Sequence, residues 1–258
     1  MATFNKNEVV LEKVKQASLY DLETGILLNR LTMIEDPTLN TTAEKEEVVD
    51  AQGETITEIY RAKKATFSGS NSLFSLDLAA SQFGTTKKVA SDDDPIVNYM
   101  SETLPIADGK VKLSKVPVEG SIRYIYIMAD GEIGESIPVG TNAETHALVG
   151  EDGTITLPTS TTEGRVYVEY PYESKEAVRI VNKSGEYPKA GKLVILALFR
   201  DKCTDKTILG SIICPKAKLN PESIDISLTP TGKHPFEYTM MKNYCDEEAE
   251  LFEIVLSK

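Results

Sequence analysis

The chain has 258 residues, of which 41% are hydrophobic and 26% charged, and its formal net charge is −12. The apolar fraction is high enough to build hydrophobic cores, which excludes a wholly disordered chain. The acidic balance disfavours binding to DNA phosphates or to anionic lipid. No apolar run reaches the ~20 residues of a membrane-spanning helix, and the first residues lack the apolar core of a signal peptide, so we expect neither a membrane span nor signal-directed export.

The acidic residues are unevenly spread along the chain. Residues 91–190 carry a net charge of −8, whereas residues 1–90 carry −3 and residues 191–258 carry −1. Such a shift in composition indicates a separate module. We therefore expect a discontinuous β domain, formed by residues 1–95 and 191–258, with a small acidic β-sandwich inserted at residues 96–190.

The N-terminal third has mostly the pattern of β-strands. We expect a strand over Ile26–Ile34, then a loop over Glu35–Thr42, which holds a proline, an asparagine and three threonines. Ala43–Val49 fits either a short helix or an arm strand. Asp50–Gly53 has the residues of a hairpin turn, and Thr55–Phe67 alternates as a long strand would.

One segment, at about residues 71–83, has a helical pattern. Ser70, Asn71 and Ser72 offer N-cap oxygens, and Gly84 stands where a left-handed C-cap belongs. The apolar residues between them recur at helical spacing and predict a buried stripe: Leu73, Leu76, Ala80 and Phe83, widened by Phe74 and Leu78.

The middle of the chain begins with the polar stretch Thr85–Asp94, which predicts an exposed linker. Short β-type runs then alternate with Asp-Gly and Glu-Gly turns, and this spacing is typical of a small sandwich. The runs are Ile122–Met128, Thr154–Leu157, Arg165–Tyr170 and Ala177–Val181.

Tyrosines recur on these middle strands. Tyr124 and Tyr126 alternate and so share a face, and Tyr170 and Tyr172 repeat the spacing around a proline that favours a strand end or an edge. Tyr167 would point to the face opposite Tyr170. Tyrosines in this pattern usually belong to a core or to cross-strand pairs, and the alternative is a face that binds carbohydrate or a partner.

The C-terminal part returns to strands. Leu193–Phe199 is apolar almost throughout, as expected of a strand buried on both faces, and Ile224, Ile226 and Leu228 alternate with polar residues as expected of a strand with one solvated face. The expected strands are Lys192–Cys203, Thr207–Ile213, Ile224–Leu228, Phe236–Met241 and Leu251–Leu256.

No set of residues predicts catalysis, a cofactor or a metal site. Neither His146 nor His234 lies at metal-ligand spacing from a cysteine, and no local signature marks a Cys–His pair as nucleophile and base. Motifs for phosphate loops, dinucleotides and nucleophile elbows are absent. The acidic runs Asp92–Asp94 and Asp246–Glu248 lack the spaced ligands of a cation loop and indicate solvated loops.

The cysteines are sparse and odd in number, so we expect free thiols in a reducing compartment. They are Cys203, Cys214 and Cys245.

Several segments together resemble the tail tube proteins of long-tailed bacteriophages. In the N-terminal third these are Leu19–Gly25, Asp50–Thr57 and Lys63–Leu73, the last leading into the predicted helix. The resemblance covers about residues 1–90 and 191–258. At the C-terminal end the segments that carry it are Thr229–Phe236, Tyr244–Cys245 and Leu251–Ile254.

The resemblance implies a mainly β fold, with a sandwich or half-open barrel flanked by one helix and an inserted immunoglobulin-like module. Copies would form rings, expected to be hexamers, with strands joined edge to edge, and stacked rings would form a tube through which DNA passes without specific binding. Glu35–Gly53 would bridge to a neighbouring subunit or ring. The protein would be a non-enzymatic virion component, made in the host cytoplasm, contacting other tail proteins and no membrane.

Two alternatives remain open from the sequence. The chain could be a capsid decoration or another virion structural protein. It could instead belong to a different class, a carbohydrate-binding or adhesin β module that uses the tyrosine faces.

Overall fold

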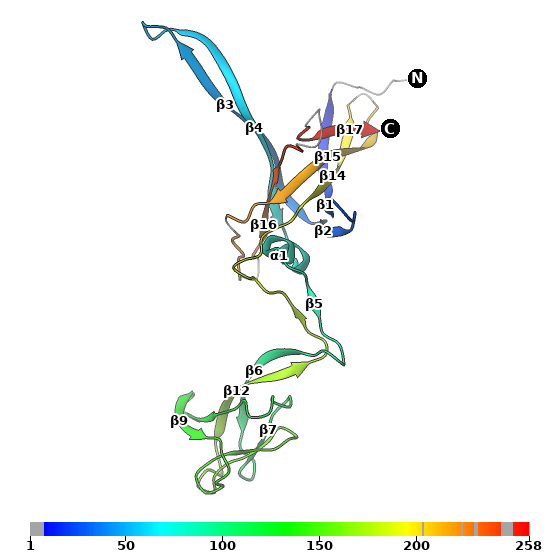
Figure 1. Cartoon of the computed structure of the whole chain (residues 1–258). Coiled ribbons are helices and arrows are strands. Elements are labelled where there is room, and N and C mark those ends of the chain that lie inside the picture. The colour runs from blue at the N-terminus through cyan, green and yellow to red at the C-terminus, as the bar shows by residue number, and fades with distance from the viewer. Residues whose placement is uncertain (1–7, 203, 223, 230–231, 244–249, 258) are drawn as a thin grey trace. The chain divides into compact units, whose positions relative to one another are not determined.

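The computed structural model describes residues 8–202, 204–222, 224–229, 232–243 and 250–257 (Figure 1). The chain is mainly β, as the sequence predicted, and the described residues contain one α-helix. It divides into two compact units. Unit 1 comprises Met1–Lys87 and Ile180–Lys258, and unit 2 comprises Lys88–Arg179.

Unit 1 is built on one antiparallel sheet of eight strands, in the order β2-β1-β14-β15-β16-β4-β3, with β17 paired to β15 beside this path. The C-terminal strands β14, β15 and β16 lie between two pairs of N-terminal strands, since β1 pairs with β14 and β4 pairs with β16. Unit 1 therefore needs both of its segments to complete the sheet. Its strands are β1 (Val9–Asp21), β2 (Leu27–Leu31), β3 (Ile34–Val49), β4 (Thr55–Asn71), β14 (Ala190–Asp201), β15 (Thr207–Leu219), β16 (His234–Met240) and β17 (Glu253–Ser257).

The core of unit 1 lies on one face of this sheet. Alternate residues of β14 and β16 are buried there, including Ile195 and Tyr238. Within it the Tyr238 hydroxyl donates to Asn29 Oδ1 at 2.8 Å, so the buried phenol has a partner. Leu193–Phe199 was expected to be buried on both faces, but only one face is fully buried and the other is partly exposed.

Two predictions for the N-terminal third are corrected by the structure. Ile26–Ile34 is not one strand, because β2 ends at Leu31 and β3 begins at Ile34. The predicted loop Glu35–Thr42 is part of β3. Pro37 is tolerated because β3 is an edge strand, and Asp36, at φ 50°, breaks the ladder beside it.

The hairpin formed by β3 and β4 confirms other predictions. Ala43–Val49 is the arm strand rather than the short helix, and Thr55–Phe67 lies within β4. Asp50–Gly53 is the turn, where Asp50 Oδ1 accepts from the amides of Gln52 and Glu54, and Gly53 adopts φ 87°.

The helix, α1 (Leu76–Phe83), is shorter than the predicted 71–83. Its N-cap is Ser75, whose Oγ accepts from the Leu78 amide, because Asn71 is held in β4 by its ladder pair with His234. Leu73 and Phe74 precede the helix, and they and Leu76 are exposed, so the predicted buried stripe is wrong for its N-terminal half. The buried helical residues are Leu78, Ala79, Ala80 and Gln82.

Gly84 is the C-cap of α1, as predicted, with φ 71°. A Cβ at this position would lie 2.2 Å from the carbonyl oxygen of Tyr187. The position therefore requires glycine for two reasons, a left-handed backbone and the close approach of another chain segment.

Unit 2 has two sheets around its own core, with a separate two-stranded ladder, β5 (Lys88–Val89) with β13 (Val178–Arg179). One sheet has the order β10-β11-β7 and the other β6-β12-β8-β9. Ile125, Ile155 and Val166 are fully buried between the sheets. The strands are β6 (Ile96–Pro105), β7 (Lys110–Lys112), β8 (Tyr124–Ala129), β9 (Glu132–Pro138), β10 (Leu148–Val149), β11 (Thr154–Thr156) and β12 (Arg165–Ser174).

The strand predictions in the middle of the chain are confirmed in position but not always in extent. Thr85–Asp94 is not wholly a linker, because it contains β5. Arg165–Tyr170 continues through Pro171 to Ser174. Pro171 lies beyond the end of the ladder between β12 and β8. Its lack of an amide hydrogen therefore removes no hydrogen bond to β8.

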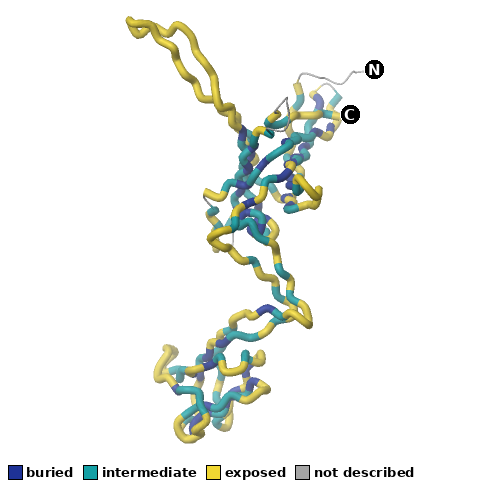
Figure 2. The backbone as a smooth tube through the Cα atoms, in the orientation of Figure 1, coloured by how far each residue is buried: buried dark blue, intermediate teal, exposed yellow. Residues whose placement is uncertain are grey.

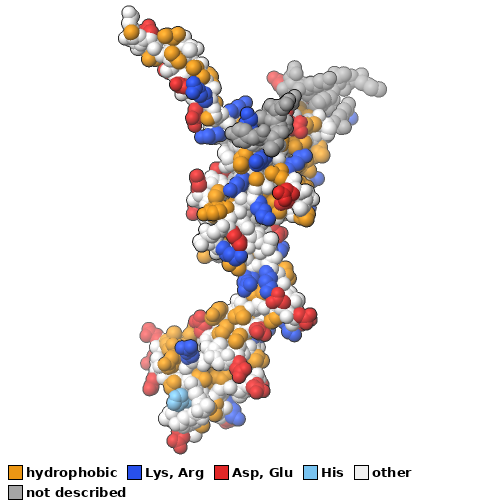
Figure 3. Space-filling model, in the orientation of Figure 1, with side chains coloured by type: hydrophobic (Ala, Val, Ile, Leu, Met, Phe, Trp, Pro, Cys, Tyr) orange, Lys and Arg blue, Asp and Glu red, His pale blue; other side chains and the backbone are white. Residues whose placement is uncertain are grey.

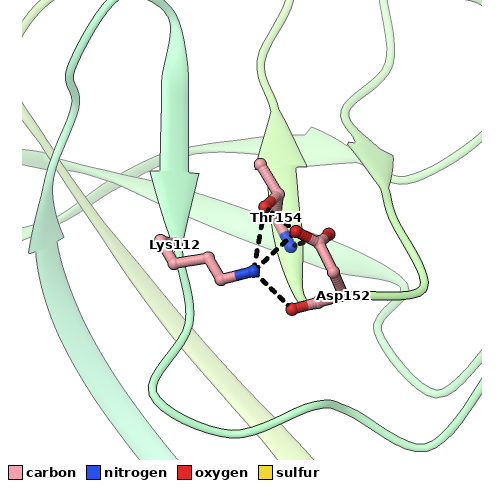
Figure 4. Close-up of polar contacts among 3 residues, drawn as sticks. All are labelled: Lys112, Asp152 and Thr154. Carbon is pink, nitrogen blue, oxygen red and sulfur yellow. Dashed lines mark hydrogen bonds and ion pairs between the residues drawn. The ribbon is translucent and has the colours of Figure 1, made fainter.

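Side-chain networks close the turns of unit 2. Lys112 Nζ lies 2.6 Å from Asp152 Oδ2 and 2.6 Å from the Asp152 carbonyl oxygen, and Thr154 also binds both partners (Figure 4). The hydrogen bonds from Lys112 and Thr154 hold the pKa of Asp152 below its usual range. This exposed network ties the turn before β11 to β7.

In the C-terminal part, one predicted strand is absent. Residues 224–229 form no ladder, and Leu228 is 94% exposed, so alternation alone gave the wrong element there. The strands predicted at Lys192–Cys203, Thr207–Ile213, Phe236–Met241 and Leu251–Leu256 correspond to β14, β15, β16 and β17.

Candidate assembly interface

The distal part of the β3–β4 hairpin, residues 40–64, is here called the arm. Every residue of the arm is exposed (Figure 2). β16 pairs only with Ala65–Asn71 of β4, so among the described residues the arm strands pair with each other alone. A two-stranded ribbon without further cover is marginally stable in water.

The arm carries apolar side chains on both of its faces. Ile59 lies opposite Glu46 on one face, and Tyr60 lies opposite Lys45 on the other. Hydrophobic and charged side chains are mixed along the arm (Figure 3). Exposed aliphatic and aromatic groups in this number favour a surface that is covered on association. The exposed large hydrophobic residues of the arm are Val48, Val49, Ile56, Ile59 and Tyr60.

Ion pairs hold the two arm strands together. Lys45 Nζ lies 2.7 Å from Glu47 Oε1 and 2.5 Å from Glu58 Oε1, and Arg61 pairs with Glu46. The hydrogen bonds that Lys45 donates to the Glu47 and Glu58 carboxylates raise its pKa above the usual range. Because these groups are exposed, the pairs add little stability and serve mainly to keep the strands in register.

A β-bulge marks the base of the arm. Thr42 pairs with Lys64 and Glu44 pairs with Arg61, so Ala43 faces two residues on β4. One of them, Ala62, has φ 48°, in the left-handed region. Bulges bend a strand and increase its twist, so this one sets the direction in which the arm leaves the sheet.

The sheet of unit 1 also has open edges. β2 pairs only with Ala17–Tyr20 of β1, which leaves Val9–Gln16 unpaired on that side among the described residues. A cleft of about 610 Å³ lies along this edge, lined in part by Leu11, Val14 and Met33. Within the described ranges, β17 is paired to β15 alone, and its Ile254 and Val255 are exposed. Open edges of this kind can accept a strand from another chain.

The described residues that were considered for catalysis have structural surroundings of their own. Cys214 is buried in β15 and its thiol donates to the Lys216 carbonyl oxygen at 3.2 Å; burial raises its pKa to about 11. His146 belongs to unit 2 and hydrogen-bonds with Thr145. Cys203 and Cys245 lie outside the described residues.

His234 is a structural residue of unit 1. Its Nδ1 accepts from the Ser75 amide at 3.3 Å, and its Nε2 therefore donates to Gln82 Oε1 at 2.8 Å. The Phe74 ring stacks on the imidazole at 5.2 Å. Burial lowers the pKa of His234, which keeps the ring neutral. These contacts tie α1 to β16.

Two carboxylates of the acidic run Asp92–Asp94 form ion pairs. Asp92 pairs with Lys175, and Asp94 pairs with Lys88. Asp246–Glu248 lies outside the described residues. Among the described residues, no cluster of three His, Cys, Asp or Glu side chains has a metal-binding arrangement.

The sequence predicted the contribution of β3 to the candidate interface but not that of β4. The turn at Asp50–Gly53 and the segment Glu35–Gly53 pointed to the arm, but the contribution of β4 was not recognised. Its signal was present, since Thr55–Lys64 mixes β-formers with charges and has no clean apolar face. The open edge of β1 had no local signal, because it depends on where β2 ends.

Comparison with known sequences agrees with the architecture. None of the described helices is long and apolar enough to cross a membrane. No curated protein matches the chain. A sequence model of the YomU/Tube protein family matches residues 9–254, which span both units. This is a family of structural proteins of the phage tail tube rather than of enzymes. The resemblance to tail tube proteins is thereby confirmed, and the chain belongs to the YomU/Tube protein family.

Proposed function

We propose that the chain is the repeating subunit of a phage tail tube, in which six copies form a ring and rings stack. Unit 1 forms the wall of the tube, and DNA passes through the lumen without specific binding. Synthesis takes place in the host cytoplasm, and the assembled protein contacts other tail proteins. Unit 2 is an inserted immunoglobulin-like module that the ring does not require.

The exposed arm is the observation that carries this proposal. Both its faces and both its edges are unpaired within the described chain, and its apolar groups lie at the surface. A second copy of the chain is the occupant that the arm fits, because unit 1 also presents an open strand edge beside a cleft lined by Leu11, Val14 and Met33. The arm of one copy can then form main-chain hydrogen bonds with the open edge of another, while the apolar side chains of both are buried.

Ring closure follows from the kind of contact. The arm and the open edges are different surfaces, so a contact between them is heterologous, and heterologous contacts close into rings or continue as helices. Open strand edges would join neighbouring copies within a ring, and arms would join one ring to the next, so every copy would use both surfaces.

The charge is compatible with DNA passage. Unit 2 holds sixteen Asp and Glu against eight Lys and Arg, a net charge of −8, so most of the excess acid lies outside the proposed wall. Unit 1 is still net acidic and offers no general attraction for phosphates.

The proposal is tested by shortening the arm. Replacing Thr42–Lys64 with Asn-Gly joins the ladder pair Thr41–Ala65 through a two-residue hairpin loop. We expect a folded protein that forms no stacked tubes in negative-stain micrographs, whereas the wild-type chain forms them at high protein concentration. Ile56→Lys with Tyr60→Lys should have the same effect without shortening the chain.

Leu228→Lys is the matched control for these charge substitutions. Leu228 is an exposed apolar residue of unit 1 outside the arm, so tube formation should persist. Tubes that survive loss of the arm would contradict its role in stacking. A wild-type chain that binds only to preformed shells would instead indicate a capsid decoration.

A further inference from the structure

The outer face of one sheet in unit 2 carries a group of tyrosines that the tube proposal does not use. In the sheet β6-β12-β8-β9, Val166, Val168 and Tyr170 point into the core of unit 2. Side chains alternate between faces along a strand, so Tyr167 points outward. By the same alternation Tyr124 and Tyr126 flank the buried Ile125 and point outward from β8.

The strand register brings these rings together. Tyr126 pairs with Tyr167, and their ring centroids are 6.4 Å apart. On the other side of β12, Tyr99 pairs with Pro171. Tyr99 is 68% exposed and Tyr124 is 53% exposed. Neighbouring strands lie about 4.8 Å apart, so β6, β12 and β8 present these rings on one continuous surface.

Polar groups lie between the rings on the same face. Ser101 pairs with Glu169, and Thr103 pairs with Tyr167. The Tyr167 hydroxyl donates to Glu169 Oε2 at 3.1 Å, and this bond raises the pKa of Tyr167. A carboxylate can accept several hydrogen bonds, so Glu169 keeps acceptor capacity for a ligand. The face therefore combines flat apolar rings with hydroxyl and carboxylate groups.

This combination fits a carbohydrate. The apolar CH face of a pyranose ring packs on an aromatic ring, while its hydroxyls need hydrogen-bond partners at the rim. The net charge of −8 on unit 2 opposes acidic polymers, including nucleic acids and charged glycans. We propose that the outer face formed by Tyr99, Tyr124, Tyr126 and Tyr167 binds an uncharged polysaccharide, with Glu169 accepting hydrogen bonds from its hydroxyls.

This inference goes beyond the proposed tube and is tested separately. The chain has no tryptophan, so its intrinsic fluorescence reports on tyrosines. The full chain is titrated with starch, galactomannan, xylan and laminarin as neutral polymers, and with heparin and polygalacturonate as charged ones. We expect a saturable change in tyrosine fluorescence with at least one neutral polymer and none with the charged polymers.

Substitutions assign the binding to this face. Tyr124→Ala with Tyr126→Ala should weaken binding at least tenfold, and Glu169→Gln should weaken it less. Tyr187→Ala removes an exposed tyrosine of unit 1 that lies outside the arm, and it should leave the affinity unchanged. Truncation of Tyr126 also removes its cross-strand contact with Tyr167 and lowers the stability of unit 2. Tyr124→Ala alone, at an exposed position, should therefore keep the wild-type thermal unfolding and still weaken binding.

Three outcomes would overturn the inference. The first is no response to any neutral polymer, and the second is a response to charged polymers alone. The third is an unchanged affinity in the Tyr124→Ala, Tyr126→Ala variant. If that variant also loses tube formation, the face is a contact between protein subunits instead.

Discussion

At the scale of single residues, His234 joins α1 to the sheet through an uncharged ring. Nδ1 accepts from Ser75, and Nε2 donates to Gln82, whose own amide donates to the Pro235 carbonyl oxygen at 2.9 Å. Protonation of Nδ1 would turn it into a donor, and the Ser75 amide would lose its acceptor. The side chain is 1% exposed, so the lost bond would be replaced poorly by water.

We predict a loss of stability in mild acid that depends on His234. Its pKa in the folded chain lies below the usual 6.5, so the unfolded chain takes up the proton first. The stabilisation is complete above about pH 6.5 and is lost as the pH falls through the folded pKa. Denaturant midpoints at pH 7, 6 and 5 should decrease for the wild type and decrease less for His234→Phe.

His146→Gln is the control for this measurement, because His146 makes no contact that ties elements of unit 1 together. It should keep the wild-type dependence on pH. An unchanged dependence in His234→Phe would mean that other groups titrate in this range.

At the scale of elements, the bulge at the base of the arm combines a special backbone with an ordinary residue. Ala62 adopts φ 48°, a conformation that costs a residue with a Cβ about 1–2 kcal/mol relative to the right-handed region. Asn and Gly are the residues that usually occupy it.

We predict that Ala62→Gly stabilises the arm by about 0.5–1 kcal/mol, since relief of strain exceeds the greater entropy of glycine in the unfolded chain. Ala43→Gly, across the same bulge, has no positive φ to relieve and should destabilise the arm by a similar amount. Amide hydrogen exchange over residues 40–64 measures both changes locally. Faster exchange in Ala62→Gly would contradict the strain argument.

Local patterns predicted those elements whose boundaries are set locally. The turn at Asp50–Gly53 and the C-cap at Gly84 depend on a few adjacent residues, and both were identified. The start of α1 was not, because ladder pairs with Ile34 and His234 extend β4 as far as Asn71. Ile224–Leu228 has the alternation of a strand and no partner, and pairing is decided by residues far along the chain.

The candidate interface could be predicted only in outline for the same reason. The arm follows from the turn and its flanking β-formers, whereas its exposure depends on where β16 stops pairing with β4. The tyrosine face of unit 2 was one of two alternatives in the sequence. Tyr170 proved to be a core residue, and Tyr126 and Tyr167 proved to be a cross-strand pair on the outer face, with Tyr124 exposed on the same face.

At the scale of the whole molecule, each unit has its own core, and the two cores share no residue. In unit 2 a polar network lies at the margin of the core, where exposed Ser114 and buried Tyr170 donate to the half-buried Glu102 carboxylate. Burial opposes the charge on Glu102, but these hydrogen bonds lower its pKa overall. The network therefore stabilises unit 2 above the usual pKa of a glutamate and weakens as the pH falls.

We predict two transitions in calorimetric unfolding at neutral pH, one for each unit. Glu102→Gln should lower the free energy of unfolding of unit 2 by about 1–2 kcal/mol, because hydrogen bonds to a charged group are replaced by bonds to a neutral one. Only the transition of unit 2 should then move to a lower temperature. Glu119→Gln, an exposed change in the same unit, should leave both transitions in place. A single transition that shifts as a whole would show that the units unfold together.

The contact between Gly84 and the Tyr187 backbone has a consequence for how such chains diversify. The polypeptide leaves unit 1 and returns to it at points that touch, so the segment between Gly84 and Tyr187 only has to close a very short gap. The cost of closing such a loop rises slowly with its length. The site is therefore a point at which a domain can be inserted, exchanged or replaced by a short turn without any change to the sheet of unit 1.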